Sequence, residues 1–259
     1  MDAGGLSRVV AVAANTYRET VRERVLLNLV FFAILMTLSG LLLQELSIRQ
    51  DAKVIKDIGL ASMEVFGTLI AVFIGVGLVS KEIERRSLYP LLAKPVSRGE
   101  FLLGKFFGLG FTLFVNVSVM TAGLYLTLFA TRGRPGLDLL KAVVPIFLGL
   151  LLVVAFALLF STVTSSALAA VCTVGVIVAG RYSDVIRNMQ QVAPDVPKWL
   201  VQGLYYALPN FGNFDLKTRV VYGDPVTLAD LAWIALYGAA YAGVVLGLAL
   251  AAFRSRELT

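Results

Sequence analysis

The chain has 259 residues, of which 58% are hydrophobic and only 15% charged, and its mean hydropathy is +0.82. A soluble domain has about half apolar and about a quarter charged residues, so this composition excludes an ordinary soluble domain and indicates an integral membrane protein. The absence of histidine and the single cysteine, Cys172, argue against a disulfide framework and against a transition-metal site. The net charge of +6 suits loops that contact anionic lipid.

The first predicted element is an amphipathic helix over residues 6–24. Leu6, Val10 and Tyr17 recur at helical spacing on one side, and the arginines lie mostly off that stripe. Such a helix lies in the membrane plane, with its apolar face toward lipid and its arginines toward phosphates. A cap helix that packs on a partner protein is the alternative interpretation.

Six spanning segments follow, and most are near the roughly 20 residues that a helix needs to cross a bilayer core. They are predicted at 25–43, 58–80, 106–130, 142–160, 167–180 and 228–253. Residues 161–166 divide the fourth from the fifth segment, because one helix over both would be about 58 Å long, against a bilayer core of about 30 Å. We therefore expect an all-α membrane protein with one transmembrane domain over residues 1–259.

Lys and Arg predict the orientation of these spans. The N-terminal segment and the 81–105 loop carry ten such residues, against three in the first loop on the opposite side. We therefore place both termini and the 81–105 loop in the cytoplasm, with the protein in the inner membrane of a prokaryote. Residues 181–227 then lie outside, as short amphipathic helices on the outer leaflet, the second between Pro197 and Pro209.

Polar and small residues inside the spans are further candidates. Glu64 is a candidate pathway residue, unless it lies near enough to the outer surface to reach water. Asn116 is expected chiefly to hydrogen-bond between helices. Two stripes of small residues would let helices approach closely, within the chain or across a dimer. They are Gly104 and Gly108 in the third span, and Ala239, Gly243 and Gly247 in the sixth.

The 81–105 loop concentrates charge in an otherwise apolar chain. Residues 87–95 are predicted to form a short helix that ends at a proline, followed by a capping box over residues 97–100. An exposed apolar patch with a charged rim is typical of a protein contact, and leucines that rest on the inner leaflet are the alternative. The patch and its rim are Glu82, Glu84, Arg85, Arg86, Ser87, Leu88, Tyr89, Leu91, Leu92 and Lys94.

The stretch EIERRSLYPLLAKPVSRGEFLLGK resembles the signature loop of ABC-2-type permeases, the membrane subunits of one class of ABC exporters. The shared pattern is E-x-E, a leucine-rich stretch, P-V-S-R and then G-K at Gly104 and Lys105. Arg86 and Ser87 depart from it, since many relatives have Gly-Thr there. Within the family, the chain is most similar to the branch associated with maturation of multicopper enzymes.

The resemblance implies that 87–95 is a coupling helix docked on a separate ATPase, which holds ATP and Mg. This chain has no G-x-x-x-x-G-K-[ST] phosphate loop, so we expect it to be non-catalytic and to bind no cofactor itself. The sequence shows no nucleic-acid-binding module, so we expect no nucleic-acid partner. The implied unit has two permease chains, forming a homodimer, and two ATPase subunits that drive export of an unidentified substrate. Alternatives are a stand-alone carrier or channel, which predicts internal repeats and several intramembrane charges, and a membrane enzyme.

Overall fold

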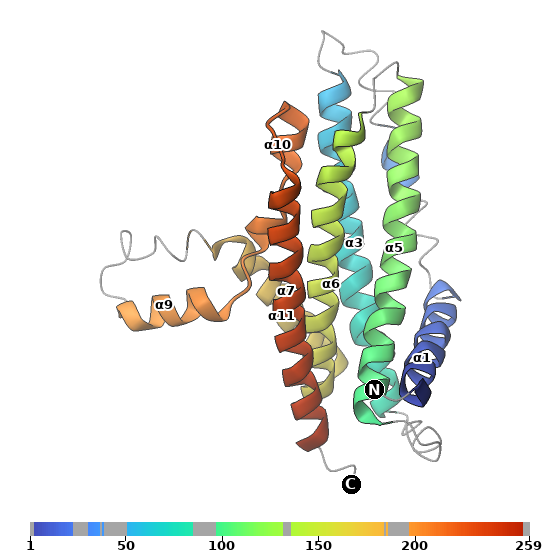
Figure 1. Ribbon diagram of the computed structural model, residues 1–259, viewed down its shortest axis with the longest axis vertical. Coiled ribbons are helices and arrows are strands. Elements are labelled where there is room, and N and C mark those ends of the chain that lie inside the picture. Colours follow the sequence, from blue (N-terminus) through green and yellow to red (C-terminus); the bar gives the residue numbers. More distant parts are fainter. Residues whose placement is uncertain are drawn as a thin grey trace.

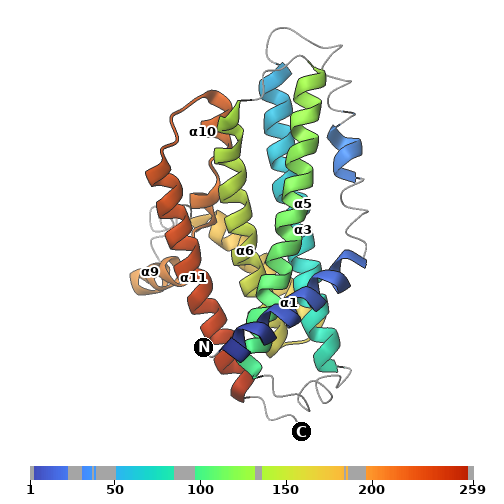
Figure 2. The same cartoon turned by 45° about the vertical axis from the view of Figure 1, so that its right-hand side comes forward.

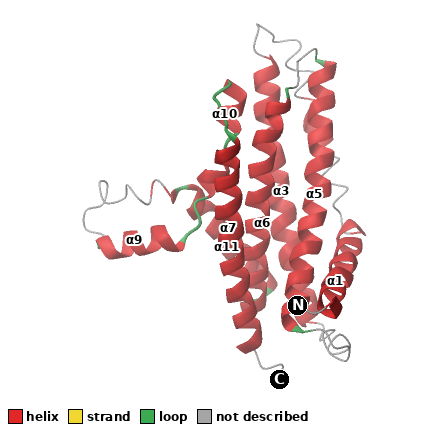
Figure 3. Ribbon diagram, viewed as in Figure 1, coloured by secondary structure: helices red, strands yellow, loops and turns green. Residues whose placement is uncertain are grey.

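The computed structural model describes residues 3–22, 31–36, 38, 51–84, 97–131, 136–183, 185 and 197–255. All regular structure in these residues is helical (Figure 3). The predicted coupling helix at 87–95 and most of the predicted first span at 25–43 lie outside the described residues.

Four long helices run side by side and form the bundle (Figure 1). They are α3 (Asp51–Glu84), α5 (Arg98–Ala130), α6 (Leu140–Val163) and α11 (Leu228–Ser255). Each contains a segment long and apolar enough to cross a membrane, whereas α7 (Ser166–Arg181) is apolar but shorter. The helices continue past the predicted apolar spans, since α3 extends to Glu84 and α5 already begins at Arg98. The charged loop between these two helices is therefore shorter than predicted.

Helix α6 lies at the centre because it is apolar on all sides. It packs against α3, α5, α7 and α11, and Leu152, Val154 and Leu158 in its middle are fully buried. Helices α5 and α11 instead leave one apolar face open, with Phe129 and Leu236 exposed. In a protein of this hydropathy, such open apolar faces are suited to lipid.

The bundle has two distinct ends. At the basal end, at the bottom of Figure 1, α3 and α11 end, α5 begins, and α1 (Ala3–Arg22) starts. Only Thr164 and Ser165 separate α6 from α7 at this end, so the predicted division of the long apolar run agrees with the structure. At the distal end, α3 and α11 begin and α5 ends.

The segment between α7 and α11 contains short helices. They are α9 (Lys198–Ala207), the 3₁₀ helix η2 (Phe211–Phe214) and α10 (Lys217–Tyr222). Pro197 and Pro209 flank α9, as predicted, and α9 points away from the bundle (Figures 1 and 2). The chain then returns tightly to α7, because a Cβ atom on Gly180 would come within 2.2 Å of the Pro209 carbonyl oxygen. This return places η2 and α10 against the distal half of the bundle.

Candidate functional site

The predicted capping box is present where the 85–96 segment joins α5. The Ser97 hydroxyl accepts a hydrogen bond from the Glu100 amide at 3.2 Å, and the Glu100 carboxylate accepts one from the Ser97 amide at 2.7 Å. Arg8 of α1 lies 3.7 Å from the same carboxylate. The start of α5 is therefore fixed by its own cap and linked to α1.

Helix α1 crosses α5 in direct contact with two glycines (Figure 2). A Cβ atom on Gly104 would come within 2.6 Å of the Val12 side chain, and one on Gly108 within 2.7 Å of the Ala13 carbonyl oxygen. Any larger residue would push the two helices apart. The first of the two small-residue stripes thus lies at a contact within the chain.

The packed face of α1 differs from its predicted apolar stripe. Leu6 and Val10 are exposed, and Thr16 and Thr20 are completely buried on another face. Each threonine hydroxyl donates to a carbonyl one turn earlier in α1, at 2.9 and 2.7 Å, so it needs no partner from another helix. Leu6 and Val10 of the predicted stripe stay open to lipid, whereas Tyr17 packs on α5, with its ring centre 4.9 Å from that of Phe111.

Lys105 is buried between α1 and α5, with only 1% of its surface exposed. Its Nζ lies 3.7 Å from a Glu19 carboxylate oxygen and 5.6 Å from the centre of the Phe101 ring. Residues 99–105 match the first seven positions of a phosphate loop, but Phe106 replaces the Ser or Thr. They also lie within continuous helix, so in this structure they form no loop around a phosphate.

Arg98 connects the start of α5 to the end of α11. Its guanidinium donates to the carbonyl oxygens of Phe253 at 2.5 Å and Arg254 at 3.3 Å, and it lies 5.4 Å from the centre of the Phe253 ring. The last carbonyls of a helix have no partner inside the helix, so an arginine here satisfies them. We call the residues that join α1, α5 and α11 at this end the basal junction: Arg8, Ser97, Arg98, Glu100, Gly104, Lys105 and Gly108.

A second group of polar contacts lies toward the distal end, around Glu64 of α3. Glu64 accepts hydrogen bonds from Arg181, the last residue of α7, and from Lys217, the first residue of α10. Arg181 also donates to Asp215 at 2.9 Å. We call these four residues the distal charge cluster. Two positive and two negative charges meet there, so the cluster has no net charge.

Pairing explains how a carboxylate is accommodated within an apolar span. An unpaired charge at membrane depth is costly, and a partly buried ion pair offsets that cost only when both partners stay in place. Glu64 and Lys217 are the least exposed members, with 21% and 11% of their side-chain surface open. The cluster therefore ties α3 to both α7 and α10. Sequence reasoning singled out Glu64 but missed Asp215 and Lys217.

Asn116 is buried in the middle of α5, with 3% of its surface exposed. Its amide donates to the Thr112 carbonyl one turn earlier, at 3.0 Å. Its side-chain oxygen has no hydrogen-bond partner within the described part of the chain. The expected bond to another helix is therefore not formed among those residues.

The other predicted site residues fall into two groups. Among the described residues, nothing lies within 4 Å of a Cβ atom built on Gly243 or Gly247, and Ala239 is exposed. The second small-residue stripe thus faces outward on α11. Glu82 and Glu84 belong to the last turns of α3. Arg85, Arg86, Ser87, Leu88, Tyr89, Leu91, Leu92 and Lys94 lie outside the described residues.

Comparison with known proteins identifies the family. No curated protein matches the chain. The family model described as ABC-2 family transporter protein matches residues 10–181, which is more than half of the chain and reaches from α1 to the end of α7. Members of this family are the membrane components that pair with an ABC ATPase. This chain therefore belongs to the ABC-2 transporter family and is a membrane protein of that family.

Proposed function

We propose that this chain is the transmembrane permease of an ATP-driven exporter, and that a separate ATPase docks on the predicted coupling helix at residues 87–95. Two permease chains and two ATPase subunits, with ATP and Mg on the ATPase, form the working unit. Both termini and the docking segment lie on the cytoplasmic side of a prokaryotic inner membrane. The family match supports the role in transport. The Lys and Arg distribution supports the orientation.

The observation that carries this proposal is the basal junction. Residues 85–96 continue directly from α3 at one side and enter α5 through the Ser97 cap at the other. The first turns of α5 hold α11 through Arg98 and α1 through Gly104. A displacement of the segment is therefore passed to four helices. The ATPase shifts the permease only if it holds the segment differently in its two nucleotide states.

The movement of α3 would reach the distal charge cluster, because Glu64 belongs to the same helix. Glu64 lies about 30 Å along α3 from Glu84, at about 1.5 Å per residue. A rigid shift of α3 would pull on Arg181 and Lys217, and through them on α7 and α10. We assign to this cluster the task of keeping the outer end closed until α3 moves.

The remaining features fit a six-span subunit that works in pairs. The proposal adds residues 25–43 as the first span and α7 as the fifth, as predicted from the sequence, to the four helices that are long and apolar enough to cross a membrane. The open stripe of Ala239, Gly243 and Gly247 suits close approach of the second, identical chain. The exported compound is unidentified, and the resemblance to the branch associated with multicopper enzyme maturation supports a place in that branch.

The test is co-purification with the ABC ATPase encoded nearest to this chain. The triple variant R85E/R86E/L91D should reduce the recovered ATPase about tenfold, because it reverses the rim charge and destroys the apolar patch. Ser165→Asp is the matched control, since it adds a charge at the basal end in the turn between α6 and α7, away from the docking segment. If the triple variant keeps its ATPase, or if the purified chain transports without any ATPase, the stand-alone carrier replaces this proposal.

A further inference from the structure

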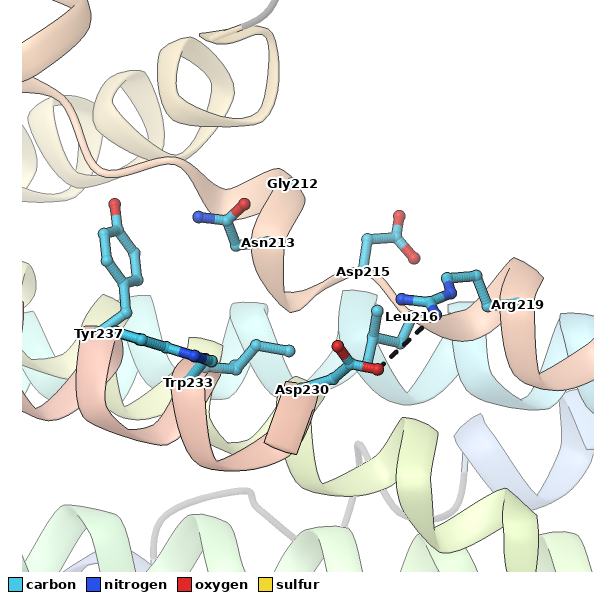
Figure 4. Close-up of a pocket in the computed structure, with 9 residues that line it drawn as sticks. Gly212, Asn213, Asp215, Leu216, Arg219, Asp230, Trp233 and Tyr237 are labelled. Atoms are coloured by element: carbon cyan, nitrogen blue, oxygen red, sulfur yellow. Dashed lines mark ion pairs between the residues drawn. The ribbon is translucent and has the colours of Figure 1, made fainter. Parts of the chain in front are cut away.

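A pocket of about 550 Å³ lies where η2 and α10 meet the first turns of α11 (Figure 4). One side is formed by Asn213, Asp215 and Arg219, and the other by Asp230, Trp233 and Tyr237. Its volume is within the roughly 300–1,000 Å³ of typical ligand pockets. The coupling proposed above shares only Asp215 with this pocket and assigns no ligand to it.

The pocket combines aromatic surface with one cationic side chain, Arg219, and two carboxylates, Asp230 and Asp215, of which Asp215 is already paired with Arg181. Both Trp233 and Tyr237 of α11 line the pocket, and Figure 4 shows Tyr237 projecting toward the segment that carries Asn213 while Trp233 lies along α11. Arg219 and Asp230 face each other across the pocket at 3.7 Å, as the dashed line in Figure 4 marks. A ligand in this space therefore meets a cationic group, an anionic group and two ring systems at once.

Both charged side chains are held in place by backbone groups. Arg219 donates to the Pro225 carbonyl oxygen at 2.7 Å, which uses one of its five N–H groups. Asp230 accepts from the Thr227 amide at 3.0 Å and so caps the start of α11. These anchors fix the guanidinium and the carboxylate in position, and the two charges offset each other as an ion pair at 3.7 Å. A headgroup with one charge of each sign can bind to such a pair without leaving either charge unbalanced.

The aromatic side adds a hydrogen-bond donor and lies next to lipid-facing surface. The Tyr237 hydroxyl oxygen accepts from the Asn210 amide at 2.8 Å, which leaves its own hydrogen available to a ligand. Trp233 is 71% exposed, and Leu228 at the start of α11 is 79% exposed. Tryptophan and tyrosine are enriched where a span meets the membrane surface, so the pocket opens at the level of lipid headgroups.

We propose that this pocket binds the headgroup of a zwitterionic phospholipid. Arg219 contacts the phosphate, and the ammonium group lies near the Asp230 carboxylate and the rings of Trp233 and Tyr237. The acyl chains extend along the open apolar face of α11. Asp215 belongs both to this pocket and to the distal charge cluster, so a bound headgroup steadies the segment that holds Arg181 and Lys217. Binding itself requires no ATPase.

The chain offers a built-in reporter, because it contains only two tryptophans, at positions 199 and 233. In the Trp199→Phe variant, all tryptophan fluorescence comes from Trp233. This protein is reconstituted in phosphatidylglycerol nanodiscs with increasing fractions of phosphatidylethanolamine brominated on its acyl chains. A second series of nanodiscs contains increasing fractions of brominated phosphatidylglycerol in unlabelled phosphatidylethanolamine. We expect half-maximal quenching at a mole fraction about threefold lower for brominated phosphatidylethanolamine than for brominated phosphatidylglycerol.

Variants and a soluble competitor complete the test. Arg219→Gln should abolish the preference, Arg219→Lys should restore part of it, and Lys141→Gln, at a different exposed ion pair of the distal end, should leave it unchanged. Equal quenching by both lipids in the parent protein, or preference for phosphatidylglycerol, would overturn the proposal without any pocket variant. Relief of quenching by millimolar glycerophosphoethanolamine would replace the lipid by a soluble zwitterion. These quenching measurements do not depend on the ATPase, so a failure of the proposed ATPase coupling would not change their outcome.

Discussion

The basal junction and the distal charge cluster join helices by different means. At the basal end, the contacts are a helix cap, an arginine on backbone carbonyls and two glycines that touch a neighbouring helix, and two ion pairs at 3.7 Å, Arg8–Glu100 and Lys105–Glu19, add to them. Toward the distal end, four charged side chains meet from α3, from α7, and from the start of α10 and the residues just before it. The backbone contacts at the basal end hold the helices in one geometry even when an ion pair there opens, whereas the distal charge cluster consists of charged pairs alone, which can separate and form again. The comparison favours a basal junction that moves as a rigid unit and a distal charge cluster whose contacts can open and close.

The largest loss of stability is expected from Glu64→Ala in the distal charge cluster. It leaves Lys217, with 11% of its side chain exposed, and Arg181 without their shared carboxylate. We expect a loss of about 2–3 kcal/mol in stability, near the lower limit for a broken buried pair because Arg181 stays partly open to water. Thermal unfolding of the purified protein in detergent measures it. The double variant Glu64→Leu with Lys217→Met should recover part of the loss, and no recovery would contradict the pairing argument.

Gly108→Leu tests how closely α1 and α5 are packed at the basal junction. The new side chain would clash with the Ala13 carbonyl and Thr16 of α1, so we expect destabilisation by about 2 kcal/mol. Gly247→Leu is the matched control, because no described atom lies within 4 Å of a Cβ atom at that position. The same pair of variants separates the two stripes. Gly247→Leu should leave the melting temperature of the single chain unchanged and weaken association of two chains, which chemical cross-linking measures.

A smaller effect is expected at the helix cap. Ser97→Ala removes the hydroxyl that accepts from the Glu100 amide and should destabilise the start of α5 by about 1 kcal/mol. Hydrogen exchange of the first turn of α5 is the direct measurement. Ser118→Ala is the control, since that hydroxyl donates within the middle of the same helix to the Phe114 carbonyl. If the first turn of α5 exchanges equally fast in Ser97→Ala and Ser118→Ala, the Ser97 cap does not stabilise the start of α5.

The two regions also differ in how far the sequence predicts them. The Ser97 cap and the Gly104 and Gly108 pair were found because their signals lie within a few residues of one another. Glu64 stood out as an acid in an apolar run, but Lys217 is 153 positions away, and only packing decides which cation meets it. The sequence did not predict that Thr16 and Thr20 are buried, because threonine is polar. In the structure, each hydroxyl donates to a carbonyl of its own helix, and this lets the side chain be buried.

The smallest expected effect comes from Lys141→Gln, at the exposed ion pair with Asp138. The Lys141 Nζ and Asp138 Oδ1 atoms lie 2.7 Å apart, and both side chains are open to solvent. Asp138 belongs to a short 3₁₀ helix (Leu137–Leu139) that continues directly into α6, where Lys141 lies. Water already solvates each charge, and the pair links only consecutive turns of the chain, so its loss should leave the melting temperature unchanged. A clear drop would mean that charge pairs anywhere at this end stabilise the fold. If the temperature stays constant while Glu64→Ala lowers it, the effect at Glu64 comes from desolvation and from the joining of three helices.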